Sequence, residues 1–111
     1  MPRDYKVYLD DILQAVDRIQ TYLQDYNFEK LSSDNRTIDA VVRNLEVIGE
    51  AVKHIPMEVR NSRPEIEWKK IGALRDILAH EYFGIDLEII WDVVKNKLPG
   101  FAEQVKKILT A

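Results

Sequence analysis

Apolar residues recur at spacings of three and four along most of this chain, which is the period of an amphipathic α-helix. The alternation of apolar and polar residues that a half-buried strand needs appears nowhere in it. The first stripe predicts a helix over about residues 3–27 and consists of Tyr5, Tyr8, Leu9, Ile12, Val16, Ile19, Leu23 and Tyr26. The spacing therefore restricts the chain to an all-α fold.

A second stripe predicts another long helix, which Ser33 or Asp34 can cap and which ends at Pro56. It consists of Ile38, Val41, Val42, Leu45, Ile48, Val52 and Ile55. Residues 27–33 break the period between the two stripes, so we expect a connector there.

Three residues inside the second helix need a separate explanation. Glycine costs about 1 kcal/mol relative to alanine in a helix, so a close approach by another helix is one reason for Gly49. Glu50 and His54 are one turn apart and can pair. A metal site would need more ligands at suitable spacing, and we therefore interpret His54 as a surface residue.

The C-terminal half predicts two further main helices and an irregular end. Residues 56–64 form a connector with one short helical turn at residues 57–61, and the third main helix begins at residues 65–68. Asp86 can cap the fourth, and Pro99 interrupts its stripe, which predicts a bent pair or a fifth short helix. We predict an up-and-down bundle of four main helices with an additional short or bent C-terminal helix, as a single domain over residues 1–111.

Composition excludes several classes of function. The net charge of −3 argues against a protein that coats nucleic acid with its whole surface, although it leaves room for a local basic groove. With no cysteine there is no disulfide framework and no thiolate metal site, which fits a reducing cytoplasm, the expected location. No apolar run approaches the ~20 residues of a membrane span, and no apolar signal segment follows the N-terminus.

The richest chemistry lies in residues 75–82, Arg-Asp-Ile-Leu-Ala-His-Glu-Tyr, on the third main helix. The core stripe of this helix consists of Ile71, Leu74, Leu78 and Tyr82, with Arg75 at its edge. Asp76 and His80 lie roughly opposite, beside Ala73 and Ile77, where a surface helix usually carries Lys and Glu. Two interpretations remain open: a second packing face for a partner chain, or a surface helix with an Asp76–His80 pair and an Arg75 salt bridge.

A locally basic run leads into this stretch. Residues 53–75 contain six Lys or Arg against three acids, which are Lys53, Arg60, Arg63, Lys69, Lys70 and Arg75 against Glu58, Glu65 and Glu67. Such a run is often only a solvated face, but this one could attract phosphates. We take Lys69, Lys70 and Arg63 as candidate RNA-binding residues.

Arg75, His80 and the nearby carboxylate of Asp76 suit metal-free phosphoryl chemistry, with no cofactor. A histidine can act as general base or acid near neutral pH, and an arginine can clamp a phosphate and stabilise the transition state. RNA carries its own nucleophile, the 2′-hydroxyl. One arginine, one histidine and one carboxylate are few groups for this reaction, and a two-fold dimer would bring two copies of them together. The sequence contains no Gly-rich phosphate loop, no nucleophile elbow and no His-Glu-x-x-His motif.

The pattern of Arg75, four residues, His80, one residue and Tyr82 resembles the signature of the HepT-like toxins, small all-helical ribonucleases of the HEPN superfamily. Residues 66–74 and 35–51 match as well, so the resemblance covers nearly the whole chain. It implies a homodimer in which the Arg75 and His80 pairs meet at the interface, and metal-independent cleavage of RNA, with tRNA as one possible substrate. It also implies a toxin role and a partner antitoxin of the nucleotidyltransferase fold, resembling MntA, which transfers AMP from ATP onto Tyr82.

One position departs from the family pattern. The residue after the family's arginine is often asparagine, whereas here it is Asp76, which could orient His80 or repel phosphate. The leading hypothesis is an RNA-cleaving toxin neutralised by a nucleotidyltransferase. The alternatives are a non-catalytic HEPN module that binds nucleotide or presents substrate to that partner, and a structural bundle without a site.

Overall fold

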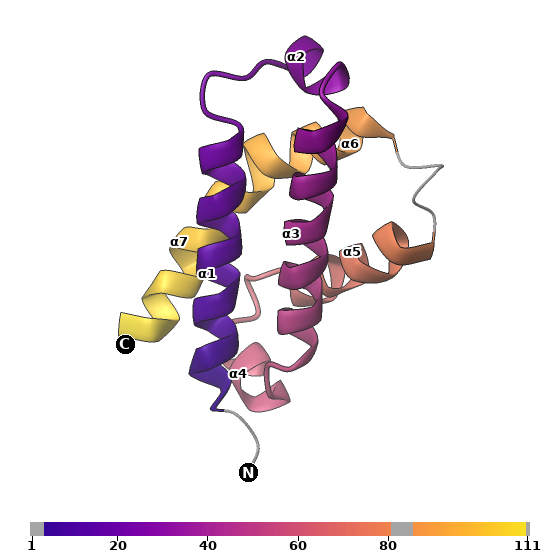
Figure 1. The fold of residues 1–111 in the computed structure, drawn as a ribbon. Helices are drawn as coiled ribbons and strands as arrows, with labels where there is room; N and C mark the ends of the chain where they lie inside the picture. The colour runs from indigo at the N-terminus through magenta and orange to yellow at the C-terminus, as the bar shows by residue number, and fades with distance from the viewer. Residues whose placement is uncertain (1–3, 81–85, 111) are drawn as a thin grey trace.

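The computed structural model describes residues 4–80 and 86–110, apart from the side chains of residues 76, 77, 79 and 80. Within these ranges all regular secondary structure is helical, which confirms the predicted all-α class (Figure 1). The main segments are α1, α3, α5 and the continuous run of α6 and α7, with α2 and α4 as short connecting helices. The predicted bundle of four main helices is therefore present.

Helix α1, Tyr5–Tyr22, begins at Asp4, whose side chain accepts a hydrogen bond from the Lys6 amide. Its buried face consists of Leu9, Ile12, Ala15, Val16 and Ile19, as the spacing predicts. The predicted end at about residue 27 is too late, because Asp25 adopts a left-handed conformation with φ of 64°. That backbone geometry cannot continue a right-handed helix, although Leu23 is still buried.

Residues 27–33, expected to be a connector, contain the short helix α2, Phe28–Ser32. The Asn27 side chain caps it by accepting from the Lys30 amide at 2.8 Å, and Leu31 is fully buried. A helix of this length is too short to show a period in the sequence, which explains why the pattern missed it.

Helix α3, Asn35–Lys53, is fixed at both ends by polar side chains. At its start, Asp34 accepts hydrogen bonds from the Thr37 amide at 3.1 Å and from the Tyr26 hydroxyl at 2.5 Å. These hydrogen bonds, that of Tyr26 foremost, lower the pKa of Asp34 from 3.8 to about 2.

At the other end of α3, Arg60 donates from Nη2 to the Val52 carbonyl at 2.6 Å and from Nε to the Ile55 carbonyl at 3.1 Å. These acceptors lie in and just beyond the last turn, where helical carbonyls lack partners within the helix. Arg60 comes from α4, Met57–Ser62, which confirms the short helical turn predicted in this connector.

The rest of the chain forms α5, Trp68–His80, and then α6, Leu87–Asp92, a π-helical turn over Val93–Lys97, and α7, Leu98–Thr110. Asp86 caps α6 as predicted, accepting from the Glu88 amide at 2.9 Å. The predicted interruption at Pro99 falls instead on the π-helical turn just before it, and Pro99 lies in the first turn of α7. Because proline has no amide hydrogen to continue the helical hydrogen bonding from the preceding residues, the irregular turn directly before it is where the run accommodates Pro99.

Helix α3 lies at the centre of the molecule. It packs against α1 on one side and is crossed by α5 on the other, while α7 packs against α1 (Figure 1). Leu45, Ile48 and Val52 of α3 are almost completely buried in the common core. The Trp68 ring meets the Phe101 ring edge to face at 6.0 Å, which ties the start of α5 to α7. The position of α5, and of its motif, is therefore set by the surface of α3.

Candidate functional site

The backbones of α5 and α3 approach each other closely where Arg75 lies over Gly49. A Cβ atom built on Gly49 would lie 2.7 Å from Arg75 Cβ and 2.8 Å from the Arg75 amide nitrogen. Both distances are shorter than real carbon contacts allow, so only glycine permits this approach. The close helix–helix contact suggested for Gly49 is confirmed, and the neighbouring residue is the arginine of the motif.

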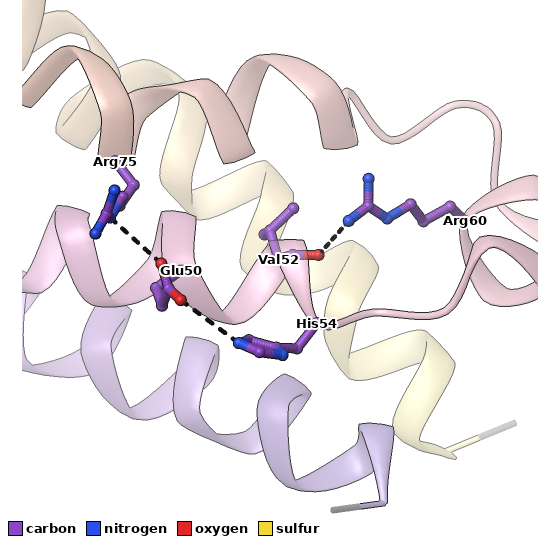
Figure 2. Close-up of polar contacts among 5 residues, drawn as sticks. All are labelled: Glu50, Val52, His54, Arg60 and Arg75. Carbon is purple, nitrogen blue, oxygen red and sulfur yellow. Dashed lines mark hydrogen bonds and ion pairs between the residues drawn. The ribbon is translucent and has the colours of Figure 1, made fainter. Parts of the chain in front are cut away.

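The next residue of α3, Glu50, joins Arg75 to His54. One carboxylate oxygen lies 3.3 Å from Arg75 Nε, and the other lies 3.5 Å from His54 Nε2 (Figure 2). All three side chains are about half exposed, at 43% for Arg75, 52% for Glu50 and 49% for His54. The sequence indicated the pair of Glu50 with His54, because it lies within one helix turn. It also offered a salt bridge of Arg75 as one interpretation, but gave no sign that the partner is Glu50 on another helix.

His54 is exposed, as predicted, but it is also held from α1. Its ring stacks on Tyr8 with centroids 4.7 Å apart and planes inclined by 10°. These residues border a groove of about 420 Å³, which is lined by Tyr8, Asp11, Arg43, Glu46, Val47, Glu50, Ala51, His54 and Arg75. The groove therefore combines cationic, anionic and aromatic groups beside the motif arginine.

The remaining residues of the motif are described only in part. Leu78 is buried, and Ile71 and Leu74 are half-buried against the core, in agreement with the predicted stripe. Asp76 and His80 belong to α5, but their side chains lie outside the description. Tyr82 lies in the undescribed segment 81–85. The second packing face thus stays a prediction. Of its residues, Ala73 has a described side chain, which is half-buried.

The residues of the basic run have different roles in the structure. Arg60 serves the end of α3, and the carbonyl of half-buried Arg63 accepts a hydrogen bond from Trp68 Nε1 at 3.2 Å. Lys69 is exposed, and Lys70 is 79% exposed and forms an ion pair with Glu67 at 3.2 Å. A role of Lys69, Lys70 and Arg63 in RNA binding remains a prediction.

Two further properties concern the described part of the chain. No group of three or more His, Asp or Glu side chains is arranged there to hold a metal ion. None of the described helices combines the length and the apolar character needed to cross a membrane.

Comparison with known proteins decides the family. Residues 12–108 match the family described as "Ribonuclease HepT-like". This chain belongs to that family. The HepT-like resemblance of the sequence is thereby confirmed, and with it an assignment to the HEPN ribonucleases. No solved structure matches the chain.

Individual HepT-like relatives match over almost the whole chain. A protein of Thermococcus cleftensis named "Probable ribonuclease HepT" is 39% identical over 108 residues, covering 97% of this chain and 98% of its own. A Methanocaldococcus jannaschii protein, provisionally named an RNase, is 44% identical over 110 residues, covering 98% and 91%. A second protein of that organism, named for a gamma-glutamylcyclotransferase joined to a provisional RNase, is 40% identical over 109 residues and is covered over 49% of its length.

Proposed function

We propose that this HepT-like protein is the toxin of a toxin–antitoxin pair. It acts as a metal-independent endoribonuclease whose composite site joins Arg75 and His80 from both chains of a homodimer. The observation that supports this best is the placement of Arg75, whose backbone is fixed against α3 and whose half-exposed guanidinium lines a groove. His80 follows on the same helix, about 7.5 Å further along its axis.

The chemistry follows from these groups. The RNA 2′-oxygen attacks the adjacent phosphorus, the bond to the 5′-oxygen breaks, and a 2′,3′-cyclic phosphate forms. A base must take the proton of the 2′-hydroxyl, and an acid must protonate the departing 5′-oxygen, which are roles suited to His80 and its copy in the second chain. Arg75 stabilises the extra negative charge on the phosphoryl oxygens in the transition state. Lys69, Lys70 and Arg63 contribute positive charge that attracts the RNA.

The proposed antitoxin is an MntA-like nucleotidyltransferase that transfers AMP from ATP to the hydroxyl of Tyr82. The adenylyl group adds bulk and negative charge seven residues after Arg75 in the sequence. Its phosphate can pair with the Arg75 guanidinium and occupy the place of the RNA phosphate. Inhibition is then steric and electrostatic and needs no refolding.

The central test is the loss of cleavage in Arg75→Ala and His80→Ala. Each variant should keep its helical circular dichroism and lose about 10²-fold or more in cleavage rate on an RNA substrate, because a charge clamp or an acid–base group is gone. Arg36→Ala, at an exposed arginine of α3 outside the groove, is the matched control and should cleave normally. Cleavage that survives both substitutions, or that stops on addition of a chelator, contradicts the mechanism.

A second test addresses the switch at Tyr82. Incubation of the wild type with the nucleotidyltransferase and ATP should add AMP mass increments and reduce cleavage. Tyr82→Phe keeps the ring but lacks the acceptor oxygen, so it should gain no mass and escape inhibition. Tyr22→Phe, at a tyrosine that is 39% exposed on α1, should behave as the wild type. Equal mass increments on Tyr82→Phe would show that the acceptor is another residue.

One observation favours the alternative of a non-catalytic module that binds nucleotide or presents substrate to the partner. The groove beside Arg75 carries three carboxylates, those of Asp11, Glu46 and Glu50, which repel a polyanion. Expression without the antitoxin separates the two functions. A ribonuclease toxin arrests growth and degrades cellular RNA, whereas a binding module does neither.

A further inference from the structure

We propose that Glu50 is a positioning residue for Arg75, and that Gly49 and Glu50 together form a seat on α3, here called the α3 seat, which aims the guanidinium at the RNA phosphate. This inference rests on the proposed ribonuclease function. It adds a residue outside the Arg-x4-His-x-Tyr motif to the machinery that prepares Arg75 for the reaction.

The first component of the seat acts on the backbone. The absence of a side chain at Gly49 allows the Arg75 amide nitrogen and Cβ to come within 3 Å of where a Gly49 Cβ would stand. The start of the arginine side chain is therefore held against the α3 backbone. A shift of α5 toward α3 is blocked by the helix itself, and a shift away opens a void.

The second component acts on the far end of the same side chain. Glu50 Oε2 lies 3.3 Å from Arg75 Nε. The Cβ and the guanidinium of Arg75 are therefore held by two successive residues of α3, Gly49 and Glu50. A carboxylate at Nε restricts the rotation of the guanidinium plane. A guanidinium carries several N–H donors arranged as a fork, so this contact is compatible with a bidentate contact to a phosphate.

Glu50 is itself oriented by a third helix. Its other oxygen lies 3.5 Å from His54 Nε2 (Figure 2). The His54 ring in turn stacks on Tyr8 of α1. The contacts thus run from α1 through α3 to α5. An arginine held in this way loses little rotamer freedom when substrate binds, which is the advantage that preorganised catalytic groups have.

A competing explanation is that Glu50 occupies the place of the RNA phosphate and must be displaced by it. The two explanations predict opposite kinetics. If Glu50 positions Arg75, its removal lowers kcat. If Glu50 competes with the phosphate, its removal lowers KM and increases the cleavage rate at low RNA concentration.

The test compares Glu50→Ala and Glu50→Gln in the full-length protein on a defined RNA oligonucleotide. Glu50→Ala should reduce kcat about tenfold to a hundredfold with a smaller change in KM, because a displaced catalytic group costs rate. Glu50→Gln keeps an acceptor oxygen and should retain intermediate activity. The matched controls are Glu103→Ala and Glu103→Gln, since Glu103 forms an exposed ion pair of the same length, 3.3 Å to Lys106, on α7. Both controls should cleave as the wild type does.

A second measurement does not depend on activity. The Nε–Hε signal of Arg75 in ¹⁵N NMR, assigned by its loss in Arg75→Lys, should be protected from exchange in the wild type and lose protection in Glu50→Ala. If the protein cleaves no RNA but this protection follows Glu50, the proposed function fails and the α3 seat stands. Unchanged protection in Glu50→Ala, wild-type kcat in that variant, or faster cleavage with a lower KM would each overturn the α3 seat.

Discussion

The polar residues that cap α3 and those on its side facing α5 serve different purposes. At the ends, Asp34 accepts the Thr37 amide and Arg60 donates to the Val52 and Ile55 carbonyls. The Thr37 amide has no partner within the helix, and the two carbonyls lie in and just beyond its last turn, so these side chains complete the two helix ends. Asp34 and Arg60 are therefore explained by the stability of α3 alone.

The side of α3 that faces α5 offers no such explanation. A glycine inside a helix costs about 1 kcal/mol relative to alanine, and the carboxylate of Glu50 pairs with side chains. Gly49 and Glu50 nevertheless occupy this region, and both contact Arg75. Residues that are unfavourable or unnecessary for the helix itself therefore indicate where another element packs against it. Here that element is α5, with the motif arginine.

The two arginines that approach α3 show the same division. Arg60 and Arg75 belong to one basic run in the sequence and are chemically identical. Arg60 donates to a main-chain carbonyl at the end of the helix, whereas Arg75 faces the Glu50 carboxylate (Figure 2). Arg75 and Glu50 also line the groove. Substitution of Arg60 should mainly affect stability, and substitution of Arg75 should mainly affect RNA cleavage.

The largest effect on stability is expected from adding a side chain at Gly49, on the side of α3 that faces α5. Gly49→Ala places a methyl group against the Arg75 backbone, which cannot move without shifting α5, so the variant should lose about 1–3 kcal/mol of unfolding free energy. Gly100→Ala is the matched control, because a Cβ there meets nothing within 4 Å. It should gain up to about 1 kcal/mol from better helix propensity. Urea denaturation measures both, and equal stability of the two variants would refute the close contact.

A smaller loss is expected at the end of α3. Arg60→Ala leaves the Val52 and Ile55 carbonyls without their charged donor and should cost about 1–2 kcal/mol, with cleavage unchanged. Arg75→Ala, at a half-exposed ion pair, should cost about 0–1 kcal/mol while abolishing cleavage. Arg60→Lys should not restore stability, because lysine lacks the planar fork. A reversed order of the two alanine variants in urea denaturation would contradict the division between the capping residues of α3 and those on its side facing α5.

The smallest effect is confined to acid pH and concerns the start of α3. The folded state lowers the pKa of Asp34 from 3.8 to about 2, so its contribution is fully present above about pH 4 and is lost as the pH falls toward 2. Asp34→Asn keeps a capping oxygen but cannot titrate. Thermal unfolding between pH 5 and 2 should therefore show a steeper loss of Tm in the wild type than in the variant. Parallel curves would show that the Asp34 hydrogen bonds do not favour its ionised form.

Local signals predicted much of the fold. Apolar spacing located α1, α3 and the C-terminal helical run, and the Asp34 and Asp86 caps follow from side chains that reach amides two or three residues away. The predictions of secondary structure that were wrong also have local causes. Helix α2 is too short to show a period, the left-handed Asp25 ends α1 early, and the irregularity assigned to Pro99 lies in the preceding π-helical turn.

For the site, the sequence by itself determined which chemical groups are available, since Arg75, His80 and Tyr82 form a short motif whose spacing is visible along one chain. It also indicated that Gly49 is exceptional, because glycine is costly in a helix. Only the tertiary structure decided that Gly49 and Glu50 receive Arg75 and that His54 and Tyr8 support Glu50. The physical reason is that periodicity and capping depend on neighbours along the chain, whereas these contacts exist only once α1, α3 and α5 pack together.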